Sequence, residues 1–210
     1  LVQQMGYKPP QRGKRVTLSI DSRLQQISFD LLRGAHGTVL VMDCDSGEVL
    51  SLVSEPGFDP NAFVDSSRHA EVRGYLRDSA RPMFNRATRS RVPPGSTFKA
   101  AVAHEALKEG KIQAGTAFTC PGKFQLGGSV FRCWQEQGHG AQTVQEALQH
   151  SCNVFFYNTG RRLGVEGIGR AARSFLLDKP TGIDLPREVS GLVPGPEWMQ
   201  KAYRQRWQEG

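Results

Sequence analysis

The tripeptide Pro93-Pro94-Gly95 is the feature that most constrains what this chain can fold into. Neither proline can continue a helix, and each disfavours helical geometry in the residue before it, whereas Gly95 tolerates a sharp change of direction. A helix is therefore predicted to begin at or near Ser96 and to end around Gly110. Apolar residues recur at helical spacing between these points: Phe98, Val102, Ala103, Ala106 and Leu107.

Ser96 and Lys99 are three residues apart at the start of this helix. Residues at that spacing share a helix face, so the sequence predicts that the Lys99 amine lies beside the Ser96 hydroxyl. The hydroxyl would lie near the positive end of the helix dipole, and a desolvated lysine could accept its proton. The motif alone also fits an N-capping serine followed by a solvated lysine. A nucleophilic Ser96 with Lys99 as its base is therefore one of two hypotheses at this point.

Composition limits the remaining possibilities. The chain has 210 residues and 38% hydrophobic content, enough for one good-sized domain with a sizeable core. No stretch approaches the roughly 18 consecutive apolar residues of a membrane span, and the start lacks the apolar region of a signal peptide. The formal charge is +7, but the basic residues are dispersed and no aromatic residues interleave with them. We therefore expect a solvated basic surface and no nucleic-acid partner.

The first half of the chain predicts a short strand, a helix and a hairpin. Residues 14–20 indicate the strand, and residues 19–34 indicate a helix. Two β-rich runs within 37–53 flank the turn Asp43–Gly47 and predict the hairpin. Residues 56–94 are polar, arginine-rich and broken by proline and glycine, so a long irregular region is expected. The apolar stripe expected on the helix consists of Leu24, Ile27, Leu31 and Leu32.

The second half is expected to be mostly helical. Thr143 and Glu146 form the sequence signature of a capping box. Helices are expected at residues 154–164 and 165–177. An isolated hairpin is marginal in water and leaves both edges open. We therefore expect either further strands beyond Gly210 or an α-rich domain with a small β annex.

A second chemical motif lies between two predicted helices, where Ser151 and Asn153 flank Cys152. If this junction is extended, the side chains of Ser151 and Asn153 point one way and that of Cys152 points the other. A hydroxyl and a carboxamide directed into the cleft of Ser96 and Lys99 could relay a proton and hold a substrate amide. Serine and asparagine are also ordinary loop residues, so this motif carries weight only together with the first.

The pair of motifs, SxxK at a helix start and SxN between two later helices, resembles the penicillin-binding proteins and serine β-lactamases. Other stretches agree with the transpeptidase domain of class B penicillin-binding proteins, and within that class the chain looks most like the penicillin-binding protein 2 branch, which acts in elongation. The resemblance covers residues 16–210. These stretches are PPGSTFK (93–99), SEPGFDPNAF (54–63), FNRA (84–87), TGIDLP (181–186) and SGLVP (190–194).

The resemblance implies an α+β transpeptidase fold of the penicillin-binding and serine β-lactamase type, and a peptidoglycan D,D-transpeptidase that β-lactams acylate. Ser96 would be the nucleophile that attacks the penultimate D-alanine of a stem peptide, with Lys99 as its base. Ser151 would relay a proton to the leaving group, and Asn153 would bind the substrate amide. A non-catalytic β-lactam sensor or pseudoenzyme on the same scaffold fits the same motifs. No GxSxG elbow is present to support a Ser-His-Asp hydrolase.

The family's third motif, KTG or KSG on a later strand, is absent from this chain, since Lys179 and Gly182 stand in the different context DKPTGID. We therefore expect a partial transpeptidase domain at 16–210, with a helical subdomain and the first two strands of its sheet, preceded by a linker at 1–15. Such a fragment would be a weak acyltransferase, because part of the oxyanion hole and the carboxylate-binding side would be missing.

The resemblance also implies a cellular context. The parent protein would lie at the extracytoplasmic, periplasmic face of a bacterial inner membrane, anchored by an N-terminal transmembrane helix outside this chain. Its partners would be peptidoglycan stem peptides, β-lactam antibiotics, a SEDS-family glycosyltransferase and the elongation complex.

Three cysteines and a histidine surround the SxN motif: Cys120, Cys133, His139 and Cys152, with the spacing C-x12-C-x5-H-x12-C. These residues could form a structural zinc site, a disulfide or buried thiols. Some penicillin-binding protein 2 sequences resemble this chain in carrying acidic, histidine and cysteine residues at corresponding places, so zinc is the expected ligand. His150 is a reserve ligand, and Cys44 in the hairpin turn is expected to play no part. A zinc-stabilised nucleic-acid binder would use the same residues but leaves Ser96 and Lys99 unexplained.

Overall fold

The structure is a computed structural model that describes residues 11–207. The chain divides into two compact units, the first ending at Arg89 and the second beginning at Ser90. Helices and short antiparallel sheets occur together, so the predicted α+β class is confirmed. Among the described residues, no helix combines the length and the apolar character that crossing a membrane requires.

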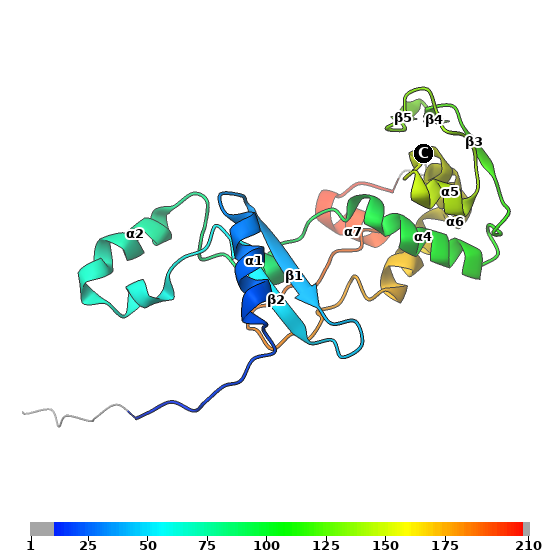
Figure 1. Ribbon diagram of the computed structural model, residues 1–210. Helices are drawn as coiled ribbons and strands as arrows, with labels where there is room; N and C mark the ends of the chain where they lie inside the picture. The colour runs from blue at the N-terminus through cyan, green and yellow to red at the C-terminus, as the bar shows by residue number, and fades with distance from the viewer. Residues whose placement is uncertain (1–10, 208–210) are drawn as a thin grey trace, which may run out of the picture. The chain divides into compact units, whose positions relative to one another are not determined.

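The first unit is built on the predicted β-hairpin (Figure 1). Strands β1 (Gly37–Met42) and β2 (Val49–Glu55) pair antiparallel, with Gly37 opposite Glu55 and a bulge next to Met42. The Asp43 carboxylate closes the turn by accepting hydrogen bonds from the backbone N–H and the hydroxyl of Ser46, at 2.7 and 2.8 Å. The predicted position of this turn is therefore confirmed.

Helix α1 (Ser22–Leu32) packs on the hairpin through polar side chains. The Gln25 amide pairs with the backbone of Leu52 in β2, donating at 2.9 Å and accepting at 2.8 Å, and the hydroxyls of Ser28 and Ser51 lie 3.0 Å apart. Of the predicted apolar stripe, Ile27 and Leu31 are exposed whereas Leu24 and Leu32 are half-buried, so the prediction is wrong in part. Gln25 and Ser28 make the polar contacts of this face, where the Gln25 amide satisfies backbone groups of β2.

The strand predicted at residues 14–20 does not form. The segment runs beside β2 with single contacts rather than a ladder: the Ser19 hydroxyl donates to the Val49 carbonyl at 2.7 Å, and Asp21 N–H donates to the Leu50 carbonyl at 2.9 Å. Asp21 instead caps α1. Of the linker predicted at 1–15, residues 1–10 lie outside the described residues, and residues 11–15 have no regular secondary structure.

The region predicted to be irregular, 56–94, contains short helices, so that prediction is wrong in part. They are the 3-10 turns η1 (Pro60–Phe63) and η2 (Ser66–Arg68), and the α-helices α2 (His69–Arg77) and α3 (Arg86–Arg89). Aspartates cap the two 3-10 turns through side-chain hydrogen bonds, a local interaction that composition alone underestimates.

The second unit contains the helices that were expected. The 3-10 turn η3 (Gly95–Thr97) leads into α4 (Phe98–Lys108), so the predicted start near Ser96 is confirmed. Helix α5 (Val144–Gln149) carries the predicted capping box. Helix α6 (Asn153–Ser174) breaks at Gly164, where φ is 68°, at the predicted boundary between two helices. Helix α7 (Pro196–Tyr203), which was not predicted from the sequence, follows.

Four short strands between α4 and α5 were not predicted. Strand β3 (Phe118–Cys120) pairs with β6 (Gly140–Gln142), and β4 (Lys123–Leu126) pairs with β5 (Ser129–Arg132), both antiparallel. Each is three or four residues long, which is too short to give a readable alternation of apolar and polar residues. Strands β3, β4 and β5 pack on α6, and β6 packs on α5.

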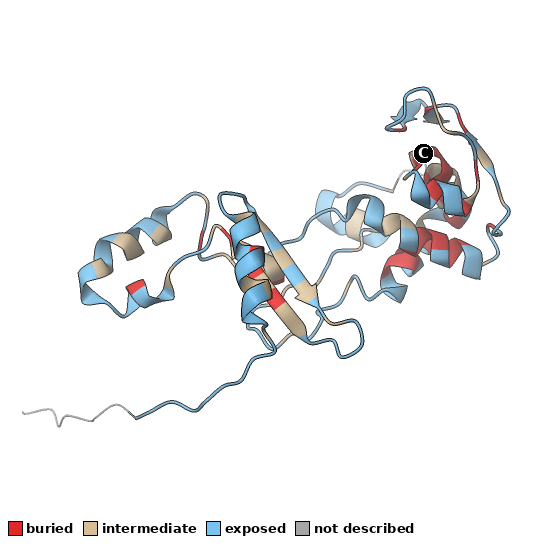
Figure 2. Cartoon of the chain, viewed as in Figure 1, coloured by how far each residue is buried: buried red, intermediate tan, exposed pale blue. Residues whose placement is uncertain are grey.

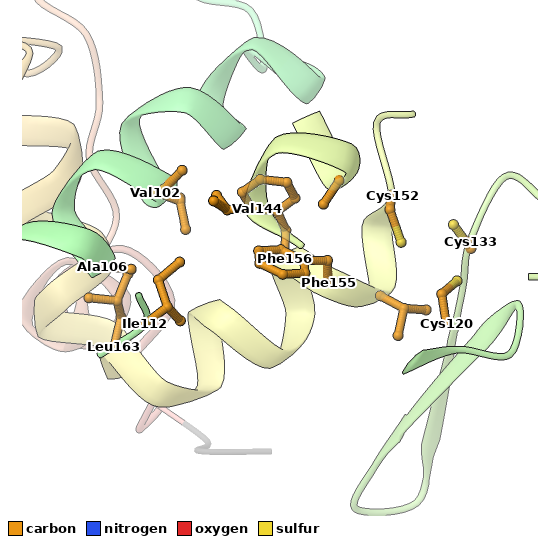
Figure 3. Packing of buried hydrophobic residues seen from close by; sticks show 13 residues of the cluster. Val102, Ala106, Ile112, Cys120, Cys133, Val144, Cys152, Phe155, Phe156 and Leu163 are labelled. Carbon is orange, nitrogen blue, oxygen red and sulfur yellow. The ribbon is translucent and has the colours of Figure 1, made fainter. Parts of the chain in front are cut away.

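The hydrophobic core of the second unit lies among α4, α5, α6 and β3 (Figure 2). Its apolar side chains continue into a group of cysteines, with Cys120, Cys133 and Cys152 at the edge of the cluster shown in Figure 3. The cluster consists of Val102, Ala103, Ala106, Ile112, Cys120, Cys133, Val144, Ala147, Cys152, Val154, Phe155, Phe156 and Leu163.

Candidate active site

Ser96 lies in the turn that leads into helix α4. Gly95, immediately before it, has φ of +59°, a backbone conformation that favours glycine. The Phe98 N–H is shared between the carbonyls of Gly95 and Ser96. The Ser96 side chain is exposed, so an external substrate can reach its hydroxyl.

Lys99 connects this turn to the SxN segment. Its ammonium donates to the Ser151 carbonyl at 2.7 Å, to the Ser151 hydroxyl at 3.0 Å and to Asn153 Oδ1 at 2.7 Å. These three acceptors use all three N–H groups of the ammonium. Lys99 is therefore connected to Ser96 through the Ser151 hydroxyl rather than by a direct hydrogen bond.

Ser151 makes the link to Ser96. Its hydroxyl donates to the Ser96 hydroxyl at 3.0 Å, so Ser96, Ser151 and Lys99 form one chain of hydrogen bonds. Ser151 has φ of +50°, and the extended junction assumed from the sequence is therefore wrong at this residue. The predicted outcome nevertheless holds: Lys99 contacts Ser151 and Asn153, while Cys152 is fully buried.

Asn153 uses both ends of its carboxamide. Oδ1 accepts from Lys99, and Nδ2 donates to the Arg132 carbonyl at 3.3 Å. The Tyr157 hydroxyl lies 3.5 Å from the same carbonyl. Neither partner was predicted from the sequence. Arg132 acts through its backbone and leaves no sequence signal, whereas the spacing of Tyr157 four residues after Asn153 on α6 would have indicated a shared helix face.

The surroundings of Lys99 favour loss of its proton. Burial lowers the pKa of Lys99 from its ordinary value, although negative charge on Cys133 and Cys152 would act in the opposite direction. The Phe156 ring centroid lies 5.7 Å from Nζ and contributes to the apolar side of this environment. A lysine with a lowered pKa is more often neutral near pH 7, which a general base requires.

The four predicted metal ligands come together beside this site. One donor atom from each of Cys120, Cys133, His139 and Cys152 lies within 4.8 Å of the others. Nδ1 of His139 lies 3.6 Å from the sulfur of Cys120 and 3.6 Å from that of Cys133. A tetrahedral zinc ion with its usual bond lengths would place nitrogen and sulfur ligands about 3.5 Å apart. All four cysteines of the chain are free thiols.

The surroundings shift the pKa values of Cys152, Cys133 and His139 in different directions. Burial raises the pKa of Cys152 to about 12. For Cys133, burial also acts to raise the pKa, but backbone N–H groups of Gln135, Asn153 and Val154 lower it overall. Burial, and then the charge of His150, lower the pKa of His139 and favour the neutral imidazole that binds a metal. Two of these N–H groups, those of Asn153 and Val154, lie at the start of α6, so Cys133 interacts with the helix start that carries Asn153.

His150 and Cys44 lie outside this cluster. The His150 ring stacks on His139 with centroids 5.8 Å apart, and its Nδ1 lies 2.8 Å from Gln142 Oε1. His150 is thus a neighbour of the ligand group rather than one of its members. Cys44 is exposed and lies in the hairpin turn of the first unit.

The chain matches known proteins over the region that contains this site. Residues 37–205 match the family of the penicillin binding protein transpeptidase domain. The peptidoglycan D,D-transpeptidase MrdA of Escherichia coli K12 is 39% identical over 212 aligned residues, covering 100% of this chain and 34% of the relative. The chain therefore spans about a third of the length of that relative.

Solved structures agree. PBP2 of Helicobacter pylori, in its complex with MreC, superposes with a TM-score of 0.85 at 32% identity over 90% of this chain and 36% of the other. Penicillin-binding protein A of Mycobacterium tuberculosis, as an imipenem acyl-enzyme complex, superposes with a TM-score of 0.75 at 28% identity over 82% and 42%. The family match extends over most of the chain and includes all four residues of the SxxK and SxN motifs, and we conclude that this chain belongs to the penicillin-binding protein transpeptidase family, resembling its PBP2/MrdA members.

Proposed function

We propose that the protein carrying this chain is a peptidoglycan D,D-transpeptidase that crosslinks stem peptides through an acyl-serine intermediate. The observation that carries the proposal is the hydrogen-bonded chain from Ser96 through Ser151 to Lys99, with both steps at 3.0 Å. Such a chain joins a nucleophile to a base. The same role is named for the MrdA relative, and the name of the M. tuberculosis structure describes acylation by a β-lactam.

The geometry suggests how the nucleophile is activated. Hydroxyl hydrogens rotate freely, so a neutral Lys99 allows both hydrogen bonds to reverse direction. Ser96 then donates to Ser151, and Ser151 donates to Lys99 Nζ. As Ser96 Oγ bonds to the penultimate D-alanine carbonyl, its proton passes along this chain to Lys99. The burial that lowers the pKa of Lys99 favours the neutral state that starts the step.

The second half of the reaction uses the same groups in reverse. When the tetrahedral intermediate collapses, the bond to the terminal D-alanine breaks, and Ser151 lies where it can return the proton to the departing amine. The amine of a neighbouring stem then attacks the acyl-serine ester and releases Ser96. Asn153 has one amide N–H that is not directed to the Arg132 carbonyl, and this donor is available to the substrate backbone.

Labelling with a fluorescent penicillin tests this proposal in a full-length protein that contains the chain. Ser96→Ala removes the only hydroxyl proposed to form the acyl-enzyme, so covalent labelling should be abolished. Ser129→Ala, an exposed serine of β5, is the matched control and should label normally. Wild-type labelling of Ser96→Ala would refute the assignment. Turnover of a D-Ala-D-Ala peptide then separates a transpeptidase from a β-lactam sensor, which would be acylated without forming crosslinks.

The proposal includes the location and partners of the whole protein. A crosslinking enzyme meets its stem-peptide substrates on the extracytoplasmic side of the membrane, and we propose this location with a membrane anchor outside the described residues. We also propose a SEDS-family glycosyltransferase and the elongation complex as partners. The complex of H. pylori PBP2 with MreC supports an assembly of this kind. Copurification with the glycosyltransferase from crosslinked membranes is the direct test.

We further propose that Cys120, Cys133, His139 and Cys152 hold one structural zinc ion. The fit is supported by four donor atoms within 4.8 Å of one another and by the tetrahedral spacing of His139 Nδ1 from two sulfurs. Four protein ligands leave no position for a reacting water, so the ion would stabilise the fold. It would fix Cys152 and thereby the positions of Ser151 and Asn153 on either side.

Elemental analysis of protein purified without added metal tests the zinc proposal. We expect one zinc per chain, its loss in Cys152→Ser together with a lower melting temperature and slower acylation, and its retention in the control Cys44→Ser. No catalytic side chain is altered in either variant. Zinc near zero in the wild-type protein would refute the site, and a mass lower by two hydrogens would identify a disulfide in its place.

A further inference from the structure

Ser151 lies in a left-handed turn at the C-terminal end of α5, which is closed by backbone hydrogen bonds from Ser151 N–H to the Leu148 carbonyl at 3.2 Å and from Cys152 N–H to the Ala147 carbonyl at 2.8 Å. Its φ of +50° is uncommon for a residue with a side chain. The carbonyl that follows this φ belongs to Ser151 itself and is held by Lys99 at 2.7 Å. The carbonyl of the preceding residue, His150, is held at 3.0 Å by the indole N–H of Trp134. Each of the two peptide units that determine where the Ser151 hydroxyl points therefore has a side-chain donor on its carbonyl in addition to a backbone hydrogen bond from its N–H.

Trp134 is placed to connect the cysteine cluster with this turn. It directly follows Cys133, and its ring meets that of His139 edge to face, with centroids 5.2 Å apart and planes at 67°. Its indole N–H then reaches across to the His150 carbonyl at the C-terminal end of α5. A shift of the indole would move the peptide unit between His150 and Ser151.

The exposure of Trp134 argues against a role in the core. The residue is 62% exposed, so burial of apolar surface does not explain a tryptophan at this position. Trp198 in α7 offers a comparison within the same unit: its ring packs edge to face on Tyr203 at 5.3 Å, away from the motif residues in sequence. What distinguishes Trp134 is its directed N–H donor.

We propose that Trp134 is a positioning residue for the acyl-transfer reaction, which holds the His150 carbonyl so that the Ser151 hydroxyl stays within reach of Ser96. The kinetic consequence of this inference rests on the proposed function, whereas the hydrogen bond from Trp134 to the His150 carbonyl does not. Loss of the indole donor leaves the peptide unit before Ser151 held by the Ser151 N–H bond to the Leu148 carbonyl, so the unit tilts about that bond and the 3.0 Å contact between Ser151 and Ser96 lengthens. A misplacement of about 1 Å in a catalytic group can cost about 100-fold in rate.

The sharpest test removes only the donor. In a full-length protein that contains the chain, Trp134 is replaced by β-(3-benzothienyl)alanine, which keeps the ring shape and lacks the N–H, and in parallel by phenylalanine. Trp198→Phe is the matched control. The acylation rate constant and the preceding dissociation constant are measured separately with a chromogenic cephalosporin, together with melting temperature and zinc content.

We expect both Trp134 variants to acylate about 10-fold more slowly with an unchanged dissociation constant, melting temperature and zinc content. Trp198→Phe should match the wild-type protein. An acylation rate constant within twofold of wild type for the isosteric variant would overturn the proposal. A slower rate accompanied by equal losses of melting temperature and zinc would also overturn it, because Trp134 would then act through general stability.

Hydrogen exchange separates failure of this inference from failure of the proposed function, because it needs no reaction. Backbone amides in residues 148–153 should exchange about 10-fold faster in the isosteric variant, while the rest of the second unit remains unchanged. If the wild-type protein does not react with β-lactams, the proposed function fails and this measurement alone decides the role of Trp134. Unchanged exchange in residues 148–153 would overturn the role.

Discussion

The two units of the chain are stabilised in different ways. In the first, the helix α1 is attached to β2 by the Gln25 amide and by hydroxyl contacts, and the buried apolar side chains among its described residues are Val53 and Ala62. The second has an apolar cluster in which Phe155 and Val154 on α6 are fully buried, together with Cys120 and Cys152. Figure 2 shows the buried residues gathered on α4, α5 and α6.

The difference explains why the chemical groups lie in the second unit. A lysine acts as a base near neutral pH only when desolvation lowers its pKa, and desolvation requires apolar neighbours such as Phe156. A hairpin with a polar helix interface cannot supply them. The cysteine cluster extends the same core to the SxN turn, so packing, ligand geometry and the position of Ser151 depend on one another.

The largest expected effect is on the acylation rate, when the desolvated lysine, Lys99, is replaced. Lys99→Met should lower the acylation rate constant by about 100-fold to 10,000-fold, because it removes the proposed base. Lys108→Met is the matched control, since Lys108 lies on the same helix α4 with its side chain 61% exposed, and it should acylate normally. Stopped-flow measurement with a chromogenic β-lactam reports both rates. Equal rates for the two variants would remove the argument that burial makes Lys99 reactive.

The pH dependence provides an independent check on the same group. The neutral form of Lys99 accepts the proton, so acylation should rise with pH and level off above the pKa of Lys99. Because burial lowers this pKa, the midpoint should fall below the ordinary lysine value of 10.5. The rate would be lost as pH falls through the lowered pKa and Lys99 becomes charged. A midpoint at or above 10.5 would contradict the proposed desolvation.

The second largest effect is expected on the free energy of unfolding, when an aromatic ring is removed from each unit in turn. Phe155→Ala should lower the free energy of unfolding by about 3–5 kcal/mol, because it leaves a large cavity in the apolar cluster. Phe58→Ala, in the first unit, removes the same ring from a position that is 40% exposed, and should cost about 1 kcal/mol. Urea denaturation of both variants measures the contrast. Similar losses would mean that the first unit has apolar packing as tight as the second.

The third effect tests the polar interface of the first unit. Gln25→Ala removes both hydrogen bonds to the Leu52 backbone and should cost about 1–3 kcal/mol. Gln26→Ala is the neighbouring control, since its amide contacts only the exposed Asp30 carboxylate, and it should change stability by less than about 0.5 kcal/mol. Urea denaturation followed by circular dichroism measures both. A neutral Gln25→Ala would show that apolar contacts hold α1 in place.

Sequence reasoning succeeded where a local signal determines structure. Pro93, Pro94 and Gly95 determined the start of α4, the turn residues determined the hairpin, and Gly164 marked the break in α6. The motifs then identified the residues that meet in the site, because Ser96, Lys99, Ser151 and Asn153 have a pattern that few functions share.

The failures have a common cause in tertiary contacts. The α1 face is decided by the backbone of β2, which no periodicity reports, and the strands β3–β6 are too short to show a pattern. The left-handed backbone of Ser151 belongs to the backbone turn that ends α5, where a serine gives no glycine-like signal, and the donors that hold its two carbonyls, Lys99 and Trp134, are distant in sequence. The partner of Asn153 is a carbonyl, which any residue at position 132 would provide.

The smallest expected effect comes from the N-terminal helix caps, which should stabilise the two units to the same extent. Asp21 caps α1 by accepting from the backbone N–H groups of Arg23 and Leu24 at 2.8 and 3.0 Å, and Thr143 caps α5 within a capping box. Asp21→Ala and Thr143→Ala should each cost about 1 kcal/mol, because a helix cap is satisfied locally and in contact with solvent. Urea denaturation with double-mutant controls measures each loss. If Thr143→Ala alone also slowed acylation, α5 would transmit strain to Ser151, and the cap would belong to the machinery that positions the site.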